Sequence, residues 1–333
     1  MKKIAVIHTA FIGDIVLSTP FIKKIKENNP DSEIYYVTTP AGKAVLNNNP
    51  YIKEIITYDK RGVHKGIKGF IEIKNKLKGI GIDKAYIPHR YLRSSALAFF
   101  SGIKERIGYS NSGGKFFLTN KIEYLKGFHE VERLFNLVEG ENPKNDKIEL
   151  FPSEKEIKNI DDLWKKMEIK DEKIVVIAPG SKWFTKMWPI EYFNELIKKL
   201  STEKCVKVII IGGKDEERLE IGSYENVENL IGKTSLLELK EIFRRSDIVV
   251  TNDSSPIHIA SATDIFIIAI FGATVREFGF YPWSKNSIII EKKDLKCRPC
   301  GIHGGKSCPE KNFKCMRDIT VETVYEEVMK RLK

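Results

Sequence analysis

The stretch DIVVTNDSSPIHIASATDIFIIAIFG, residues 247–272, contains an apolar run, a turn, a short helical pattern and a second apolar run in succession. The two apolar runs, 247–253 and 265–272, are rich in β-branched residues and have the length of buried strands. Two strands joined through a helix pair in parallel, because parallel neighbours need a long crossover connection. Strands that are almost entirely apolar are typical of a parallel sheet covered by helices on both faces.

The same alternation of strand and helix extends along the chain. Further strand patterns lie at 3–8, 33–37, 54–58, 84–88 and 105–109, and then at 173–180, 207–213 and 287–291. Helical patterns such as 190–200 and 236–246 lie between strands, and a polar passage with prolines, 140–156, separates the two series. We therefore expect two doubly wound α/β domains, residues 1–152 and 153–333. Ligands of such sheets bind at the carboxyl ends of the strands, so we expect a site in the cleft between the domains.

The composition is that of a soluble globular protein, with 42% hydrophobic and 30% charged residues. A net charge of +11 favours an anionic partner, although a solvated lysine-rich surface explains it equally well. The basic residues do not form a run interleaved with aromatic residues, so we expect no nucleic-acid partner. His8 and Asp14 interrupt the first apolar run, and no run reaches the length of a membrane span. These features predict a cytoplasmic protein.

The first strand pattern is followed by FIGDIVLSTPFIKKIK, residues 11–26. Gly13 permits a tight turn, and the apolar spacing predicts a helix that begins at Ile15, next to Asp14. An acid at this position is favoured as a helix cap. A carboxylate at the end of a strand is also suited to act as a general base, and both interpretations remain open.

Two further loops predict binding of a diphosphate. In APGSKWFTKMWP, residues 178–189, a turn exposes backbone N–H groups beside the hydroxyl of Ser181 and the cations of Lys182 and Lys186. The spacing is not that of a P-loop, and an ordinary loop over Trp188 is the alternative.

The second loop is TNDSSPIHIASA, residues 251–262, in which a strand ends and a helix begins. Ser254 and Ser255 are favourable helix N-caps, and a helix start is a common phosphate site. His258 is placed to donate to a phosphate or a sugar hydroxyl, and packing is its alternative role. Asp253 either caps the helix or binds a sugar hydroxyl.

Weaker signals follow two more strands. Thr234, after Gly232, lies in a loop that suits a nucleotide base, and Glu216 is placed for ribose hydroxyls. No GxGxxG follows the first strand, which is unfavourable for a dinucleotide-dependent dehydrogenase. No DxD pair is present, so we expect no metal-clamped diphosphate and no required cofactor.

Four of the five cysteines are crowded into residues 297–315, at Cys297, Cys300, Cys308 and Cys315. A zinc ribbon favours a second closely spaced pair, which this segment lacks. Reduced thiols that pack a loop-rich segment are therefore preferred over a metal site.

Taken together, FIGDIVLSTP, APGSKWFTKMWP, TNDSSPIHIASA, FGAT (271–274) and the cysteine-rich tail resemble bacterial lipopolysaccharide heptosyltransferases of glycosyltransferase family 9. The resemblance implies the GT-B architecture, in which two Rossmann-like domains face each other across a cleft. It also implies an acceptor-binding N-terminal domain and a donor-binding C-terminal domain. The implied reaction is a metal-independent, inverting transfer of L-glycero-D-manno-heptose from ADP-heptose to the inner core of lipopolysaccharide.

The family pattern also implies roles for single residues. Asp14 matches the general base, and the donor contacts are matched by Ser181, Lys186, Glu216, Thr234, Asp253, Ser254 and His258. Many relatives have glycine where this chain has Ser255, so close approach of the backbone to the donor is in question there.

The implied acceptor is anionic, lipid A-linked and held at the inner membrane, so we expect peripheral contact with that membrane. Basic residues of the N-terminal half are candidates for binding it: Lys60, Arg61, Arg90 and Arg93. A nucleotide-sugar epimerase, or transfer of another sugar on the same architecture, is the alternative function.

Overall fold

The computed structural model describes residues 1–138, 143 and 146–333. The chain divides into two compact units, Met1–Phe151 (unit 1) and Pro152–Lys333 (unit 2). Within the predicted polar passage 140–156, residues 140–142 and 144–145 lie outside the described residues, and its last residues begin a helix at Glu154.

Unit 1 is a parallel six-stranded sheet with the strand order β3-β2-β1-β4-β5-β6. Its strands are β1 (Lys3–Ile7), β2 (Glu33–Thr38), β3 (Glu54–Thr57), β4 (Lys84–Ile87), β5 (Glu105–Tyr109) and β6 (Asn120–Ile122). Its helices are α1 (Ile12–Leu17), α2 (Thr19–Asn28), α3 (Pro40–Leu46), α4 (Gly66–Ile80), α5 (Leu92–Phe100) and α6 (Glu130–Asn136), with a short 3-10 helix η1 (Lys115–Phe117). The strand order reverses between β1 and β4, which is where such a sheet binds ligands.

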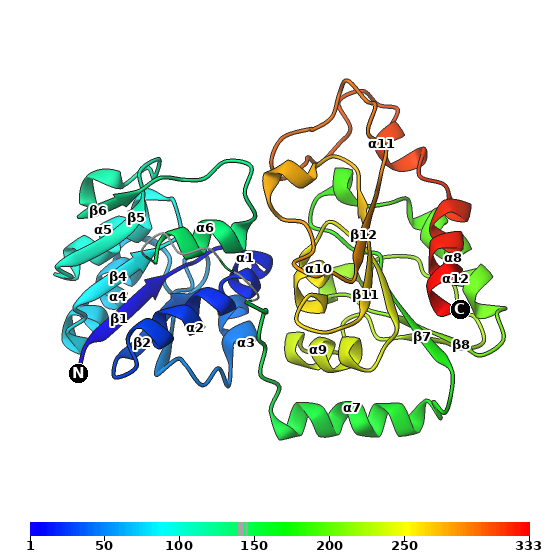
Figure 1. The fold of residues 1–333 in the computed structure, drawn as a ribbon, viewed down its shortest axis with the longest axis horizontal. Coiled ribbons are helices and arrows are strands. Elements are labelled where there is room, and N and C mark those ends of the chain that lie inside the picture. Colours follow the sequence, from blue (N-terminus) through cyan, green and yellow to red (C-terminus); the bar gives the residue numbers. More distant parts are fainter. Residues whose placement is uncertain (139–142, 144–145) are drawn as a thin grey trace. The chain divides into compact units, whose positions relative to one another are not determined.

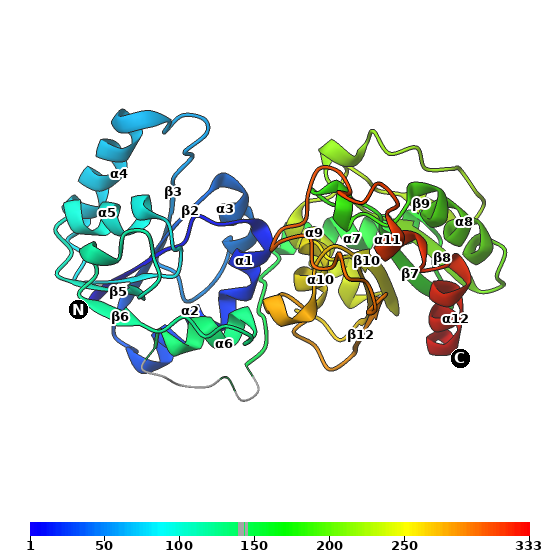
Figure 2. The ribbon, with the colours of Figure 1, turned by 90° about the horizontal axis from the view of Figure 1, so that it is seen from above.

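Alternate residues of the central strands of unit 1 point to opposite faces and bury both. Ile7 packs in one core cluster with Leu77 of α4 and Leu97 of α5. On the other face, Phe21 of α2 packs edge-on against Tyr86 of β4, with 5.6 Å between the ring centroids. Figure 2 shows α4 and α5 on one side of the strands of this unit and α2 and α6 on the other.

Unit 2 repeats this topology, with the order β12-β11-β10-β7-β8-β9 and parallel pairing throughout. Its strands are β7 (Lys173–Ala178), β8 (Val206–Ile210), β9 (Val227–Asn229), β10 (Ile248–Asn252), β11 (Phe266–Phe271) and β12 (Ser287–Glu291). Its helices are α7 (Glu154–Lys166), α8 (Ile190–Ser201), α9 (Leu236–Arg244), α10 (Ser255–Ala260), α11 (Lys314–Arg317) and α12 (Val321–Leu332), with 3-10 helices η2 (Phe184–Lys186), η3 (Lys214–Glu216) and η4 (Arg276–Phe278). The strand order reverses between β7 and β10.

One face of the sheet of unit 2 is covered by α8 and α12 and the other by α9 and α10, as Figure 1 shows. Trp188, just before α8, is fully buried, and its indole Nε1 donates to the carbonyl of Ile319 at 2.9 Å. Phe193 of α8 and Val324 of α12 belong to the same core cluster as Trp188. This packing joins the segment after β7 to the region before α12.

The structure confirms every strand predicted from the sequence and adds two, β6 and β9. Both additional strands are three residues long, lie at sheet edges and are only partly buried. Because such strands need no apolar run, the sequence pattern did not indicate them. The predicted first helix is wrong in its start, because α1 begins at Ile12 and ends at Leu17, and α2 follows as a separate helix. Asp14 therefore lies inside the first turn of α1. Across the described ranges, no helix has both the length and the apolar character needed to cross a bilayer.

Candidate functional site

The loops that follow β7 and β10 are joined by a buried asparagine, Asn252, at the end of β10. Its side-chain oxygen accepts the backbone N–H of Trp188 at 2.9 Å, and its amide nitrogen donates to the carbonyl of Pro179 at 2.7 Å. The hydroxyl of Ser254 donates to the carbonyl of Gly180 at 3.3 Å. Two loops that are far apart in the sequence are thus held together where the strand order reverses.

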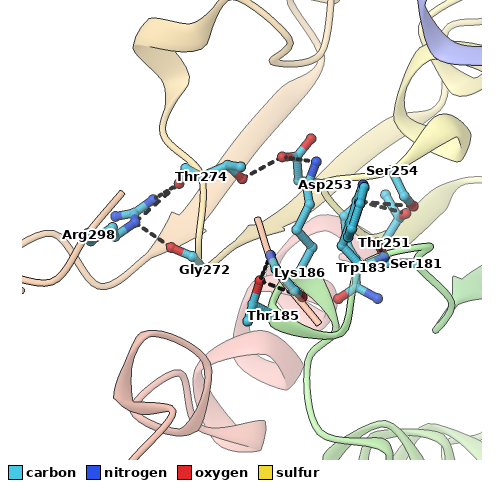
Figure 3. Close-up of polar contacts among 12 residues, drawn as sticks. Ser181, Trp183, Thr185, Lys186, Thr251, Asp253, Ser254, Gly272, Thr274 and Arg298 are labelled. Atoms are coloured by element: carbon cyan, nitrogen blue, oxygen red, sulfur yellow. Dashed lines mark hydrogen bonds and ion pairs between the residues drawn. The ribbon is translucent and has the colours of Figure 1, made fainter. Parts of the chain in front are cut away.

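A buried ion pair lies at the same edge of the sheet. Nζ of Lys186 is 2.6 Å from Oδ2 of Asp253, and the hydroxyl of Thr274 donates to the same oxygen at 2.5 Å. Figure 3 shows Lys186 and Thr274 directed at this carboxylate from different segments. The side chains of Lys186 and Asp253 are only 14% and 6% exposed, so removing either one leaves a poorly solvated charge. The residues predicted to bind phosphate and sugar are therefore direct neighbours.

The cysteine-rich segment supports this pair through backbone contacts. Nη2 of Arg298 donates to the carbonyl of Thr274 at 2.6 Å. The same nitrogen lies 2.5 Å from Oε2 of Glu291, with which it forms an ion pair. Thr185, next to Lys186, accepts the N–H of Gly305 on its hydroxyl at 2.7 Å and donates its own N–H to the carbonyl of Gly305 at 3.1 Å. Arg298 thus holds Thr274 at one end of the Lys186–Asp253–Thr274 arrangement, as Figure 3 shows, and Gly305 holds Thr185 beside Lys186 at the other.

His258 of α10 is buried and close enough to Lys186 to be affected by its charge. Burial, followed by the charge of Lys186, lowers the pKa of His258 to about 3, so the ring is neutral at physiological pH. Its Nδ1 has no hydrogen-bond partner among the described residues. A neutral histidine still offers one donor and one acceptor, which keeps its predicted role as a hydrogen-bonding contact chemically possible. Ser255, at the start of α10, is half-buried.

The predicted ribose contact, Glu216, lies directly over the loop after β7. An added Cβ on Gly180 would stand 1.7 Å from Oε1 of Glu216, so only glycine allows this approach. Burial raises the pKa of Glu216, and the N–H of Gly213 stabilises the carboxylate with a 2.7 Å bond. Ser181 is buried, and its hydroxyl accepts the N–H of Trp183 at 3.4 Å. Glu216 and Ser181 are therefore brought to the same loop.

The remaining predicted donor contacts differ in exposure. Lys182 is exposed. Thr234 lies before α9, and its hydroxyl oxygen is buried with no hydrogen-bond partner in the part of the chain that the structure describes. Gly232, two residues earlier, has a φ of +74°, a conformation that glycine adopts without strain.

In unit 1, Asp14 occupies the third position of α1 and is partly buried. Its Oδ2 accepts the N–H of Phe11 at 3.2 Å, so the carboxylate does stabilise the start of the helix. A second acid is close enough to interact with it: Glu130 of α6, which is buried and paired with Arg133 at 3.1 Å. Burial and then the charge of Asp14 raise the pKa of Glu130 to about 7. Sequence reasoning missed Glu130, because nothing in its local pattern indicates burial.

The free energy of unfolding should depend on pH through the ionisation of Glu130. A raised folded-state pKa means that stabilisation is complete below the ordinary value of 4.5 and is lost as pH rises through about 7. We expect the natural chain to lose up to about 3 kcal/mol between pH 4.5 and 8 from this group, and Glu130→Gln to lack that loss. Urea unfolding of both proteins at several pH values measures the difference. The exposed Glu123→Gln is the matched control, and parallel pH profiles for Glu130→Gln and the natural chain would contradict the assignment.

The predicted basic residues lie in unit 1. Nζ of Lys60 donates to the hydroxyl of Thr9 at 2.8 Å, and burial, Arg93 and Arg61 together lower its pKa. These three cations therefore gather near the loop after β1. The guanidinium of Arg90 lies 4.2 Å above the ring of Tyr124, and its charge also acts on His89.

A half-buried histidine, His89, adjoins Lys60 and was not predicted as a site residue. Nδ1 of His89 lies 2.8 Å from the hydroxyl of Ser94 and 3.2 Å from that of Thr9. Burial and the charge of Lys60 lower the pKa of His89 to about 3, so it is neutral. It links the loops after β1 and β4, which meet where the strand order of unit 1 reverses.

The four clustered cysteines are free thiols. Burial first, and then the neighbouring thiols, raise the pKa of Cys315 to about 11 and also raise that of Cys300. These two side chains are therefore protonated thiols rather than thiolates at neutral pH. Among the residues that the structure describes, no group of three or more His, Cys, Asp or Glu could hold a metal ion. The preference for packed thiols over a metal site at Cys297, Cys300, Cys308 and Cys315 stays a prediction, and the effect of the other three thiols on Cys315 shows that the four are neighbours.

Comparison with known proteins adds to this geometry. The Campylobacter jejuni protein named lipooligosaccharide heptosyltransferase 2 is 26% identical over 344 residues, and the match covers 98% of both chains. The glycosyl transferase family 9 structure from Veillonella parvula has a TM-score of 0.85 at 24% identity and covers 99% of this chain and 97% of that one. The E. coli ADP-heptose LPS heptosyltransferase II structure has a TM-score of 0.80 at 21% identity, with 100% and 98% covered. The predicted fold, the two Rossmann-like domains of GT-B, is confirmed.

A family model also matches, and it spans residues 71–312, more than half of the chain. The matched range includes the loops after β7 and β10, the Lys186–Asp253 pair and most of the cysteine-rich segment. The resemblance predicted from the sequence is thereby confirmed: the chain belongs to glycosyltransferase family 9 (heptosyltransferase), and it is a glycosyltransferase.

Proposed function

We propose that this enzyme transfers L-glycero-D-manno-heptose from ADP-heptose to the inner core of lipopolysaccharide, with inversion and without a metal ion. The observation that carries the proposal is the buried Lys186–Asp253 pair between the loops after β7 and β10. A cation and a carboxylate side by side suit a donor that has a diphosphate next to a polyhydroxylated sugar. The names of the relatives, lipooligosaccharide and ADP-heptose LPS heptosyltransferases, support this choice of donor and acceptor.

In the proposed step, the carboxylate of Asp14 takes the proton of an acceptor hydroxyl as that oxygen attacks the anomeric carbon. The bond between that carbon and the diphosphate oxygen breaks, and its electron pair leaves with ADP. Attack from the face opposite the leaving group inverts the configuration. The reaction needs one general base on the acceptor side and stabilisation of negative charge on the donor side.

In this proposal, unit 2 binds the donor, ADP-heptose. Lys186 stabilises the charge that grows on the departing ADP, and Asp253, held by Thr274, binds a heptose hydroxyl. Further donor contacts come from the loops around this pair: Ser181, Lys182, Glu216, Thr234, Ser254, Ser255 and His258. Because Asp253 already holds Lys186 in place, the cation is oriented before the donor arrives.

Unit 1 binds the acceptor in this proposal. Its loops gather Lys60, Arg61 and Arg93 near Thr9, and Arg90 stands beside Tyr124. These cations suit the phosphates and acidic sugars of an inner-core acceptor. Such an acceptor is lipid-linked, so the enzyme would act in the cytoplasm at the inner membrane, in peripheral contact with it.

The decisive experiment supplies the purified enzyme with ADP-heptose and a panel of truncated core acceptors. Mass spectrometry should find one added heptose on one acceptor class, in the presence of EDTA as well as in its absence. Nuclear magnetic resonance of the product reports the anomeric configuration. Parallel reactions with ADP-glucose and ADP-mannose test the choice of sugar. Transfer of another sugar in preference to heptose would overturn the proposed donor.

A further inference from the structure

One face of unit 1 presents a continuous cluster of aromatic side chains from three elements. Phe70 of α4 lies 6.4 Å from Phe100 of α5, measured between ring centroids, and Phe100 lies 5.2 Å from Phe99. Phe117 of η1 stacks on Phe99 at 4.8 Å, and Phe116 lies 4.5 Å from Phe117. Helices α4 and α5 lie next to each other in Figure 2, and their residues are in contact.

Much of this cluster is open to solvent. Phe100 is 53% exposed and Phe116 is 67% exposed. On α4, Ile67 is 75% and Ile71 is 45% exposed, and these two lie one turn apart beside Phe70. We call Phe70, Phe99, Phe100, Phe116 and Phe117, together with Ile67 and Ile71, the aromatic surface. An exposed apolar surface that spans several elements marks an interaction site rather than scattered exposed residues.

The chain around the aromatic surface is strongly basic. Residues 60–80 contain seven Lys and Arg but a single acid, Glu72. Residues 90–117 contain five Lys and Arg and again a single acid, Glu105. Both acids have basic partners, since Glu72 lies 3.3 Å from His64 and Glu105 lies 3.0 Å from Lys84. Exposed lysines such as Lys68 and Lys115 directly adjoin the apolar residues in the sequence.

This combination selects one kind of partner. Exposed phenylalanines and isoleucines that insert into an interface, flanked by lysines that face anionic headgroups, are the features of a protein that lies on a membrane surface. The headgroups of an anionic leaflet complement this excess of positive charge.

We infer that the aromatic surface docks unit 1 on an anionic lipid bilayer, with α4, α5 and η1 facing the lipid. The aromatic surface thereby makes the peripheral membrane contact of the proposed function, and its assignment rests on that function. Exposed lysines near the bilayer add electrostatic attraction to the anionic headgroups, and salt weakens this attraction.

The test is sedimentation of the full chain with vesicles of phosphatidylcholine alone or with about a third phosphatidylglycerol. We expect binding to the anionic vesicles that falls at 0.5 M NaCl and little binding to neutral vesicles. The double variant Ile67→Ser/Phe116→Ser should lower the partition coefficient at least tenfold. Ile302→Ser, a comparably exposed apolar residue of unit 2, is the matched control and should bind as the natural chain does.

Two further variants separate charge from apolar insertion. Lys68→Glu/Lys115→Glu should weaken binding to anionic vesicles and flatten its salt dependence, while Lys198→Glu on the exposed side of α8 should not. Unchanged vesicle binding by the Ile67→Ser/Phe116→Ser protein would overturn the inference. Loss of self-association in that variant, with vesicle binding unaffected, would assign the surface to a second copy of the chain and overturn it as well.

Transfer to a soluble, deacylated acceptor keeps this test independent of the reaction. The Ile67→Ser/Phe116→Ser variant should retain that activity, because neither residue belongs to the proposed site. A chain that binds anionic vesicles through this surface but transfers no heptose to any acceptor would refute the proposed function and leave the docking surface standing.

Discussion

Replacing Asp14 by asparagine is expected to lower kcat about a thousandfold, the usual effect of losing a general base, while the affinity for ADP stays within twofold. Asparagine still accepts the N–H of Phe11 through its side-chain oxygen, so the start of α1 keeps its hydrogen bond. It cannot take the proton of an acceptor hydroxyl. The variant therefore separates the two roles that the position of Asp14 allows.

Asp14→Ala completes this comparison. Alanine removes the helix-start hydrogen bond as well, which costs about 1 kcal/mol of stability. We expect it to have the same kcat as Asp14→Asn but a lower melting temperature. Steady-state kinetics, ADP titration calorimetry and thermal unfolding of the three proteins provide the measurements. If Asp14→Asn kept turnover within threefold of the natural chain and only Asp14→Ala lost it, Asp14 would be a cap and not the base.

Replacing Lys186 by methionine is expected to weaken ADP binding about 10- to 100-fold, because a hydrogen bond from a charged donor contributes roughly 1.5–3 kcal/mol. The rate of transfer should fall further, since in the proposed mechanism Lys186 also stabilises the charge that develops on the leaving group. The same change leaves the buried carboxylate of Asp253 with only Thr274 as a described partner in this arrangement, and that charge would repel a diphosphate. Lys198→Met, on the exposed side of α8, is the matched control.

The double variant Lys186→Met/Asp253→Asn distinguishes the two causes of weak binding. If repulsion by Asp253 were responsible, neutralising it would restore ADP affinity nearly to that of the natural chain. A direct contact between Lys186 and the phosphates predicts that affinity stays low in the double variant. Thermal unfolding of both variants shows whether either has simply lost the fold. Unchanged ADP affinity in Lys186→Met would end the assignment of Lys186 to the donor phosphates.

Much of the fold could be read from local pattern. Buried strands in a parallel sheet are apolar on both faces, so the apolar runs 173–178 and 266–271 could be predicted as strands. The two edge strands β6 and β9 could not be predicted in this way, because they are short and half-exposed. The start of α1 was placed too late because Ile12 and Gly13 resemble a turn, whereas Phe11 precedes the helix and Asp14 closes its first turn.

The site could be predicted only where a loop carried its own chemistry. Ser181, Lys186 and Asp253 stand out because polar groups follow an apolar strand. Glu130 did not stand out, since its coupling to Asp14 arises from packing of α6 across more than one hundred residues of sequence. The contacts of Arg298 and Thr185 with distant backbone are equally invisible, because a main-chain carbonyl has no signature in the sequence.

The dependence of the Lys186–Asp253 pair on residues 298–305 has a consequence for how the protein is made on the ribosome. Unit 1 has all of its residues once residue 151 has been synthesised and has left the ribosome, and it can then fold as a unit. Unit 2 must wait, because its core includes Val324 and Val328 of α12, and its charged pair is supported by Arg298 and Gly305. During synthesis the half with the proposed base is therefore complete first, and a nascent chain has the proposed acceptor side long before it has the proposed donor side.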